Sequence, residues 1–158
     1  MAYIQNSRLL FSRFTSVPVN GTSETTLYSN TVPARAFMAN GDMLRFEYAG
    51  LFGTDVNGKF LTLKFNNLEI LNSSDYSDLD TGTLSQRWTI EGSITRVSSS
   101  VVRGTATLGL QDRGYNSYLE ITGLTLDTTS YIILLRGNGS TTTSITAVRG
   151  SGILYNIR

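Results

Sequence analysis

The chain contains no cysteine and no histidine among its 158 residues. Without cysteine it can form no disulfide, no thiolate nucleophile and no zinc site built on cysteine. Without histidine it lacks the side chain that most often acts as a general base near neutral pH, and the most common metal ligand. A Ser-His-Asp triad is excluded for the same reason. The absence of disulfides is compatible with assembly inside a cell.

Charged residues and long apolar runs are also scarce. Charged side chains make up 16% of the chain, and the net charge is +1. A binder of the phosphate backbone needs a basic patch that this composition does not provide. No apolar run approaches the roughly 20 residues that cross a bilayer, and the N-terminal segment does not resemble a signal peptide. We therefore expect neither nucleic acid nor a membrane as a partner. No glycine-rich phosphate loop is present, and we predict no cofactor.

The chain is rich instead in serine, threonine, glycine and asparagine, with 10% aromatic residues. This composition is typical of β-rich proteins with many turns. Residues 44–49 and 60–65 alternate, with large apolar side chains on one side of each run and mostly polar ones on the other. Such alternation predicts half-buried strands. Because a glycine-containing loop joins the two runs, we predict that they are antiparallel neighbours. The pair Asn66-Asn67 after the second run predicts a tight turn or a bulge.

The same pattern continues through the second half of the chain. Residues 86–97 and 102–110 alternate around a serine-rich turn, which predicts a second hairpin. Tyr131–Leu135 is a continuous apolar run, and we expect it to be buried on both faces, either inside the sandwich or against a partner chain. The whole pattern predicts an all-β fold, an antiparallel β-sandwich of about eight to ten strands without helices.

The first 20 residues differ from the rest. Their apolar side chains are Leu9, Leu10, Phe11 and Phe14, flanked by two arginines. A proline and an Asn-Gly pair then break the chain. Two interpretations stay open: residues 1–20 form a first strand of the same sandwich, or they form an arm whose four apolar residues dock on another subunit. Residues 21–158 are predicted to form the sandwich domain.

Several segments together resemble a known family. They are the Pro-Ala pair at 33–34, the Asn-Gly-Asp turn at 40–42, Lys59–Phe65, Gln86–Arg96, and Asn138–Arg149 with the closing strand after it. In this order they resemble small jelly-roll structural modules in the virions of tailed bacteriophages. The resemblance covers residues 22–158.

The resemblance implies a jelly-roll (TNF-like) architecture and a non-enzymatic structural role. It implies a capsid decoration or head-fibre protein, or a tail-fibre or other tail-appendage module, commonly a homotrimer. It also implies contact with capsid or tail proteins, and a location in the virion after assembly in the host cytoplasm. Residues 1–20 lie outside the resemblance and would be the attachment arm.

An alternative function is binding of carbohydrate or of a host receptor by a tail module. Rigid amphipathic rings suit binding surfaces, and tyrosines lie in or beside the predicted loops at 72–85 and 111–117. Tyrosines are also common in sandwich loops that bind nothing. The candidate contacts to a host surface glycan are Tyr76, Tyr115, Asn116 and Tyr118.

Acidic residues supply two further candidates. Asp75, Asp78 and Asp80 could hold Ca²⁺, but the EF-hand spacing is absent, and a solvated loop is the favoured interpretation. A pair of carboxylates could hydrolyse a glycosidic bond. The strand glutamates each fit an outward position of an alternating row, so we predict no metal site, no catalytic residue and no enzyme. These glutamates are Glu47, Glu69, Glu91 and Glu120.

Overall fold

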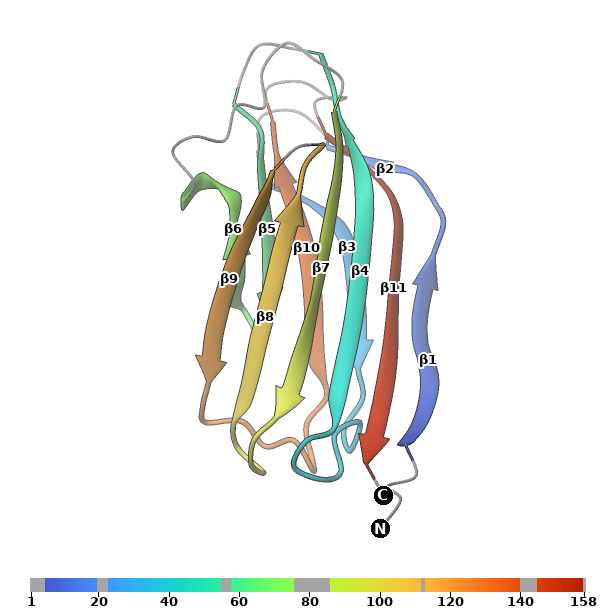
Figure 1. Cartoon of the computed structure of the whole chain (residues 1–158), viewed down its shortest axis with the longest axis vertical. Coiled ribbons are helices and arrows are strands. Elements are labelled where there is room, and N and C mark those ends of the chain that lie inside the picture. Colours follow the sequence, from blue (N-terminus) through green and yellow to red (C-terminus); the bar gives the residue numbers. More distant parts are fainter. Residues whose placement is uncertain are drawn as a thin grey trace.

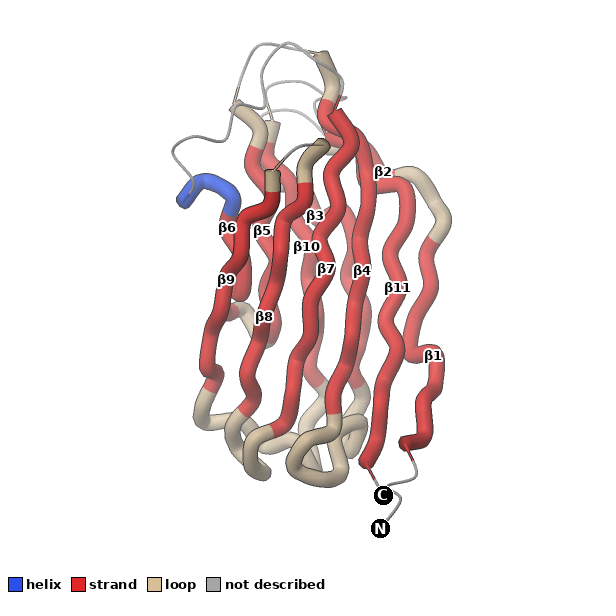
Figure 2. Tube along the Cα trace, in the orientation of Figure 1, coloured by secondary structure: helices blue, strands red, loops and turns tan. Residues whose placement is uncertain are grey.

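The computed structural model describes residues 5–19, 23–54, 58–75, 86–111, 113–139 and 145–157. These ranges contain eleven β-strands and one short 3-10 helix, Ser73–Asp75, but no α-helix. The strands run along the long axis of the molecule, and loops lie at its two ends (Figure 1, Figure 2). The predicted all-β fold is confirmed.

The larger sheet has seven strands. Six of them follow the order β1-β11-β4-β7-β8-β9, and the seventh, the short β2, pairs with β11. All of its pairings are antiparallel. The strands are β1 (Gln5–Arg13), β2 (Val17–Pro18), β4 (Met43–Phe52), β7 (Gln86–Arg96), β8 (Val102–Gly109), β9 (Gly114–Ile121) and β11 (Ile145–Ile157).

The smaller sheet has the order β3-β10-β5-β6 and is also antiparallel. Its strands are β3 (Thr25–Val32), β5 (Phe60–Phe65), β6 (Leu68–Asn72) and β10 (Tyr131–Asn138). The chain crosses between the sheets after β2, β3, β4, β6, β9 and β10. Early strands β3 and β4 thereby pair with late strands β10 and β11, one pair in each sheet. The result is the predicted antiparallel sandwich of jelly-roll type.

One predicted pairing is wrong. The alternating runs at 44–49 and 60–65 are not neighbours, because β4 pairs with β11 and β7 whereas β5 pairs with β10 and β6. The loop between them carries the chain from one sheet to the other. Alternation shows which side of a strand is buried. It does not show whether two strands are neighbours in one sheet or lie in opposite sheets, because both arrangements bury the inner sides. The hairpin of β7 and β8 is confirmed.

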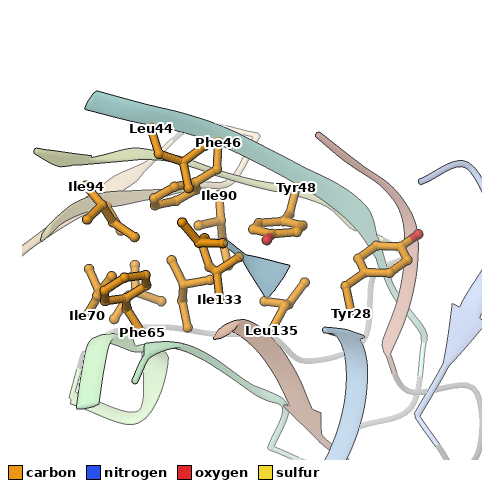
Figure 3. Close-up of a cluster of buried hydrophobic side chains, with 14 of the residues drawn as sticks. Tyr28, Leu44, Phe46, Tyr48, Phe65, Ile70, Ile90, Ile94, Ile133 and Leu135 are labelled. Carbon is orange, nitrogen blue, oxygen red and sulfur yellow. The ribbon is translucent and has the colours of Figure 1, made fainter. Parts of the chain in front are cut away.

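The core lies between the two sheets (Figure 3). The inner side of β4 contributes Leu44, Phe46 and Tyr48, which face Ile133 and Leu135 on β10 across the gap. All five are buried, as the alternation predicts. Trp88 on β7 is also fully buried, which agrees with a core role rather than ligand contact.

The apolar run in β10 is buried on one face only. The prediction that both of its faces are buried inside the sandwich is therefore wrong. Tyr131, Ile133 and Leu135 are buried, but Ile132 is 49% exposed and Leu134 is half-buried. β10 is a central strand of the smaller sheet, and the outer face of that sheet carries no third layer among the described residues. The other alternative, that a partner chain covers this face, stays a prediction.

Several aromatic rings of the larger sheet lie opposite glycines on neighbouring strands. An ideal Cβ on Gly92 would lie 2.1 Å from the Thr105 carbonyl oxygen and 2.6 Å from Cζ of Phe46. These glycines therefore leave the room that the rings fill. The pairs are Phe46 with Gly92, Tyr48 with Gly150, Trp88 with Gly50, and Phe11 with Gly152.

Candidate functional site

The outward side chains of the larger sheet form rows that cross five strands. The rows arise because β11, β4, β7, β8 and β9 pair in continuous register across the middle of the sheet. The three central rows are Ser151, Glu47, Glu91, Thr107 and Asn116; Ile153, Arg45, Ser93, Thr105 and Tyr118; and Tyr155, Met43, Thr95, Arg103 and Glu120.

A hollow of about 560 Å³ lies over the first two of these rows, and we call it the central groove. It is lined by hydroxyl, carboxylate and guanidinium groups and by the phenol of Tyr155; Phe46 and Gly92 also line it, although the Phe46 ring points into the core (Figure 3). Two hydrogen bonds fix side chains along one wall. Ser93 Oγ and Thr105 Oγ1 are 3.1 Å apart, and the Thr107 hydroxyl donates to Asn116 Oδ1 at 2.7 Å.

Some charged groups of the groove have an ion-pair partner and others do not. Glu47 forms an ion pair with Arg149 on β11. Glu91 lies directly opposite Glu47, and Arg45 lies one row away on the same strand as Glu47. Like charges in directly opposite positions destabilise a sheet pair. Within the described part of the chain, neither Arg45 nor Glu91 has an ion pair or a side-chain hydrogen bond, so both are available to a ligand.

The structure brings together two of the four strand glutamates considered above. Glu47 and Glu91 share the groove. Glu69 on β6 pairs with Lys64 at 3.4 Å, and Glu120 on β9 pairs with Arg103 at 3.1 Å. Glu120 also raises the pKa of Arg103 through its hydrogen bond. Tertiary pairing of β4 with β7 created the Glu47–Glu91 pair, which lies 44 residues apart in the sequence.

Three of the four predicted glycan contacts lie in a strand. Tyr115, Asn116 and Tyr118 lie in β9, which begins at Gly114, so the predicted loop at 111–117 is too long. Their polar sequence suggested a loop, but full pairing with β8 makes it a strand. Tyr118 is 59% exposed on the outer face, beside Asn116, whereas Tyr115 points the other way and packs against the core.

The remaining predicted contacts cannot be placed. Tyr76, Asp78 and Asp80 lie outside the described residues, and only the backbone of Asp75 is described, in the 3-10 helix. Within the described ranges, no three carboxylates are grouped so that they could hold a metal ion. No helix in those ranges has the length and apolar character required to span a bilayer.

The predicted arm residues lie on and beside an edge strand. Residues 5–13 form β1, which pairs along its length with β11, so this segment is a strand of the larger sheet. Leu9 is 64% exposed and Phe14 80% exposed, while Leu10 and Phe11 are half-buried. The Phe11 ring packs over Gly152. Whether these apolar residues also contact another subunit stays a prediction.

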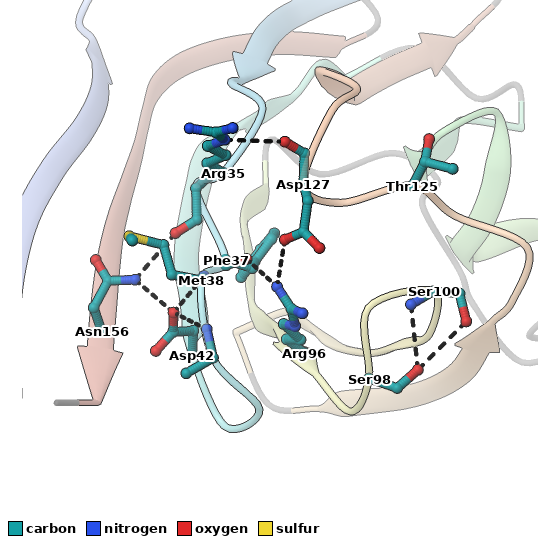
Figure 4. A network of polar contacts seen from close by, with 12 residues as sticks. Arg35, Phe37, Met38, Asp42, Arg96, Ser98, Ser100, Thr125, Asp127 and Asn156 are labelled. Atoms are coloured by element: carbon teal, nitrogen blue, oxygen red, sulfur yellow. Dashed lines mark hydrogen bonds and ion pairs between the residues drawn. The ribbon is translucent and has the colours of Figure 1, made fainter.

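A buried polar network closes one end of the sandwich (Figure 4). The carboxylate of Asp42 accepts hydrogen bonds from the backbone N–H groups of Met38 (2.6 Å), Ala39 (2.9 Å) and Ile157 (2.8 Å), and from the Asn156 side chain (2.8 Å). Burial raises the pKa of Asp42, but these hydrogen bonds together outweigh it and hold that pKa below its usual value. The carboxylate thus ties the 38–42 turn to the end of β11.

Arg96 performs a similar role beside it. Its guanidinium Nη1 donates to the Phe37 carbonyl oxygen at 2.6 Å and to Asp127 Oδ1 at 3.0 Å. The side chain of Arg96 is almost fully buried. Sequence reasoning recognised the Asn-Gly-Asp turn but not these partners, because they are 31 to 115 residues distant in the chain. The network holds the loops in place and presents no open site.

Comparisons with known proteins identify no family. No protein-family model matches the chain, and no curated protein matches its sequence. Structural matches include peanut lectin with a nonamer peptide (9% identity, 98% of each chain, TM-score 0.40). They also include the exoplasmic/lumenal domain of VIP36 in its Ca²⁺/Man3GlcNAc-bound form (11% identity, 94% of this chain and 82% of that one, TM-score 0.42). The infectious bursal disease virus VP2 subviral particle matches with 12% identity, 99% of this chain, 42% of that one and a TM-score of 0.23. Likeness at this level carries no argument about function.

Proposed function

We propose that the chain is a non-enzymatic structural module that assembles with copies of itself and attaches to a larger particle. The resemblance of residues 22–158 to tailed-bacteriophage modules suggests a virion, with the module acting as a capsid decoration, a head fibre or a tail appendage. The observation that carries the assembly is the outer face of the smaller sheet. We call this surface the outer face of β10.

The outer face of β10 has an apolar centre and a charged rim. Ile132 and Leu134 follow each other along the middle of the face, and Phe60 on β5 is 39% exposed on the same side. On the rim, Lys64 pairs with Glu69 on one side, and on the other Arg136 pairs with Glu24 at 2.5 Å. An apolar centre within a polar rim is the usual anatomy of a protein interface.

Oligomeric state tests this proposal. We expect the chain to be a trimer in solution, as the resemblance implies, and Ile132→Glu to give monomers, because it places a charge at the centre of the contact. The matched control is Ile153→Glu, which changes an equally branched side chain on the outer face of the larger sheet, 37% exposed. Mass measurement by light scattering or native mass spectrometry distinguishes these states. A wild-type monomer at high concentration would contradict the proposal.

Attachment is tested better by substitution than by deletion. Residues 5–13 are hydrogen-bonded to β11, so a chain lacking them would expose a new sheet edge. We expect Leu9→Lys with Phe14→Lys to abolish binding to purified particles while the monomer fold, followed by circular dichroism, is unchanged. Binding that survives this double substitution would show that the attachment surface is elsewhere.

A second candidate function, glycan binding, is favoured by the central groove. Arg45 and Glu91 have no ion-pair partner among the described residues, and the groove also offers hydroxyl groups and the phenol of Tyr155. We expect Glu91→Gln and Arg45→Gln to abolish any signal on a glycan array, with Arg87→Gln as the control on the same face. A glycan bound equally by all three variants would place its site elsewhere.

A further inference from the structure

We propose that the free edge of β1 binds an extended, acidic segment of a partner protein, which adds to the larger sheet as a further strand. This inference rests on the proposed role as an attached module, and it names the chemistry of the attachment. It follows from three features of β1: an open edge, charge of one sign, and the placement of both arginines on one face of the strand.

The edge of β1 is open. β1 ends the larger sheet, and its side away from β11 has no strand partner among the described residues. Six of the eight residues from 6 to 13 are exposed and none is buried. An edge with unpaired backbone N–H and C=O groups is a template for another strand.

Side-chain hydrogen bonds join the two sheets at both sides of the sandwich. At β9, the Ser117 hydroxyl donates to the Ile70 carbonyl of β6, so the two sheets meet there. At β3, the Tyr28 hydroxyl donates to the Thr15 carbonyl at 2.7 Å, and Arg13 Nε donates to Asn30 Oδ1 at 3.4 Å.

The charge along β1 has one sign. Arg8 and Arg13 are its charged residues, and the first acidic residue of the chain is Glu24. Arg35 lies near the start of β1, where a hollow of about 340 Å³ is lined by Arg8, Arg35 and neutral residues. None of these three arginines has an ion pair with a described carboxylate. Their neutral acceptors leave the positive charge uncompensated.

The backbone of Arg35 supports the idea that its position matters. Its φ is 61°, a left-handed conformation that a residue with a long side chain adopts rarely. The turn is held by the Arg35 N–H, which donates to the Leu126 carbonyl at 3.0 Å, and by Nε, which donates to the Asp127 carbonyl at 3.3 Å. Glycine would fit this backbone without strain. The arginine is therefore kept at a cost to the turn.

Both arginines of β1 lie on the same face of the strand. Arg8 lies opposite Leu154 and Arg13 opposite Gly150, both on the inner face of β11, so the arginines share the inner face of β1. Phe11 lies opposite Gly152 and shares this inner face, whereas Leu9 lies opposite Ile153 on the outer face. Residues alternate between faces in a strand. The complementary partner therefore alternates acidic and apolar residues, with the acidic side chains on the arginine side.

Charge argues against a second copy of the chain as the occupant. Two β1 strands side by side would bring four arginines together without a carboxylate, and like charges in neighbouring strands are destabilising. The arginines thus both protect the edge from self-association and select an acidic strand. A shift to dimer upon removal of the arginines, in Arg8→Gln with Arg13→Gln, would be consistent with this selection.

Synthetic peptides test the inference on the intact chain. The probe is an acetylated, fluorescein-labelled octapeptide of alternating glutamate and valine. Its matched control is the same peptide with lysine in place of glutamate. We expect the glutamate peptide alone to raise fluorescence anisotropy, with binding that weakens as salt is added. Arg8→Gln with Arg13→Gln should weaken it about tenfold, whereas the control Arg87→Gln, an exposed arginine on β7, should not.

N-methylated peptides test the strand addition itself. In an added strand, alternate backbone N–H groups point toward β1. Of two peptides, one methylated on every glutamate nitrogen and one on every valine nitrogen, only one should therefore bind. Equal binding of both isomers, equal binding of the lysine peptide, equal loss in Arg87→Gln, or tighter binding of an oligo-dT octamer would each overturn the inference. None of these outcomes depends on whether the chain is a trimer, so the two proposals can fail separately.

Discussion

At the scale of single residues, the larger sheet depends on glycines that lie opposite aromatic rings. Gly92 leaves room for the Phe46 ring, and Gly50 leaves room for Trp88. A Cβ atom added at either glycine would lie 2.0 to 2.1 Å from a backbone carbonyl oxygen, which cannot move without disturbing the strand pairing. The sequence shows the glycines but not which ring fills the room beside each.

Gly92→Ala tests this dependence. We expect it to lower the free energy of unfolding by about 1–3 kcal/mol, because the new methyl group overpacks a buried position. The control is Gly114→Ala in β9, where the nearest side-chain atom would be 3.8 Å away in ordinary contact. Urea unfolding of the two variants measures the difference. A Gly92→Ala protein as stable as Gly114→Ala would contradict the packing described.

Asp42 gives a pH-dependent prediction. Its pKa is lower in the folded chain than the value of about 3.9 expected in the unfolded chain. The ionised carboxylate therefore stabilises the fold above that unfolded value, and the contribution is lost as the pH falls through the folded pKa. Asp42→Asn should lower stability at pH 7 by about 1–3 kcal/mol, because the amide nitrogen that replaces one carboxylate oxygen cannot accept: either the Ile157 N–H or the three donors to Oδ2 lose their acceptor.

The same variant should have a flatter dependence of stability on pH below about 4. Urea unfolding at several pH values between about 7 and about 2.5 compares the two proteins across the range in which this carboxylate titrates. The difference between wild type and Asp42→Asn should shrink as the pH falls. A constant difference across this range would show that the charge of Asp42 does not contribute to stability.

At the scale of elements, the hairpin of β5 and β6 shows how much a short segment specifies. The two-residue connection, Asn66-Asn67, has φ values of 52° and 63°. Positive φ at both positions is characteristic of a type I′ turn, in which asparagine followed by glycine is preferred. Of the two predicted alternatives, the tight turn is confirmed, because this turn depends on the backbone preferences of two adjacent residues.

Asn67→Gly should stabilise the protein by about 0.5–1 kcal/mol, since glycine adopts positive φ without strain. Asn67→Ala should destabilise it, because alanine lacks the tolerance of asparagine for this conformation. Thermal unfolding followed by circular dichroism gives the order of the three proteins. A glycine variant less stable than wild type would mean that the asparagine side chain itself stabilises the turn.

β9 is an element whose structure its local sequence does not specify. Tyr115, Asn116 and Ser117 have the composition of a loop, yet they pair with β8 residue by residue. A weak local preference for strand is overridden when a neighbouring strand supplies hydrogen-bonding partners. The predicted ligand contacts in this segment therefore lie in a strand and not in a loop. Tyr118 is exposed there, and Tyr115 is not.

At the scale of the whole molecule, the two sheets leave different surfaces for contact. The outer face of β10 is apolar at its centre, and the outer face of the larger sheet is polar with the central groove. If the outer face of β10 joins copies of the chain, unfolding is coupled to dissociation, and the thermal midpoint rises with protein concentration. Ile132→Glu should remove this dependence.

The comparison of midpoints at two concentrations, about a hundredfold apart, makes this test independent of hydrodynamic measurement. At low concentration Ile132→Glu and wild type should unfold at similar temperatures, because an exposed substitution changes the stability of the monomer by only about 0.5 kcal/mol. A wild-type midpoint that does not change with concentration would count against assembly through this face.

The sequence by itself determined the fold class, the inward and outward sides of the central strands, and the tight turns. These properties follow from the order of neighbouring residues, since side chains alternate along a strand and turn residues act within a few positions. Tertiary structure alone decided that β4 and β5 lie in opposite sheets, that Glu47 meets Glu91, and that Asp42 binds the end of β11. Each of these joins residues far apart in the chain, and alternation is the same whichever strand becomes the neighbour.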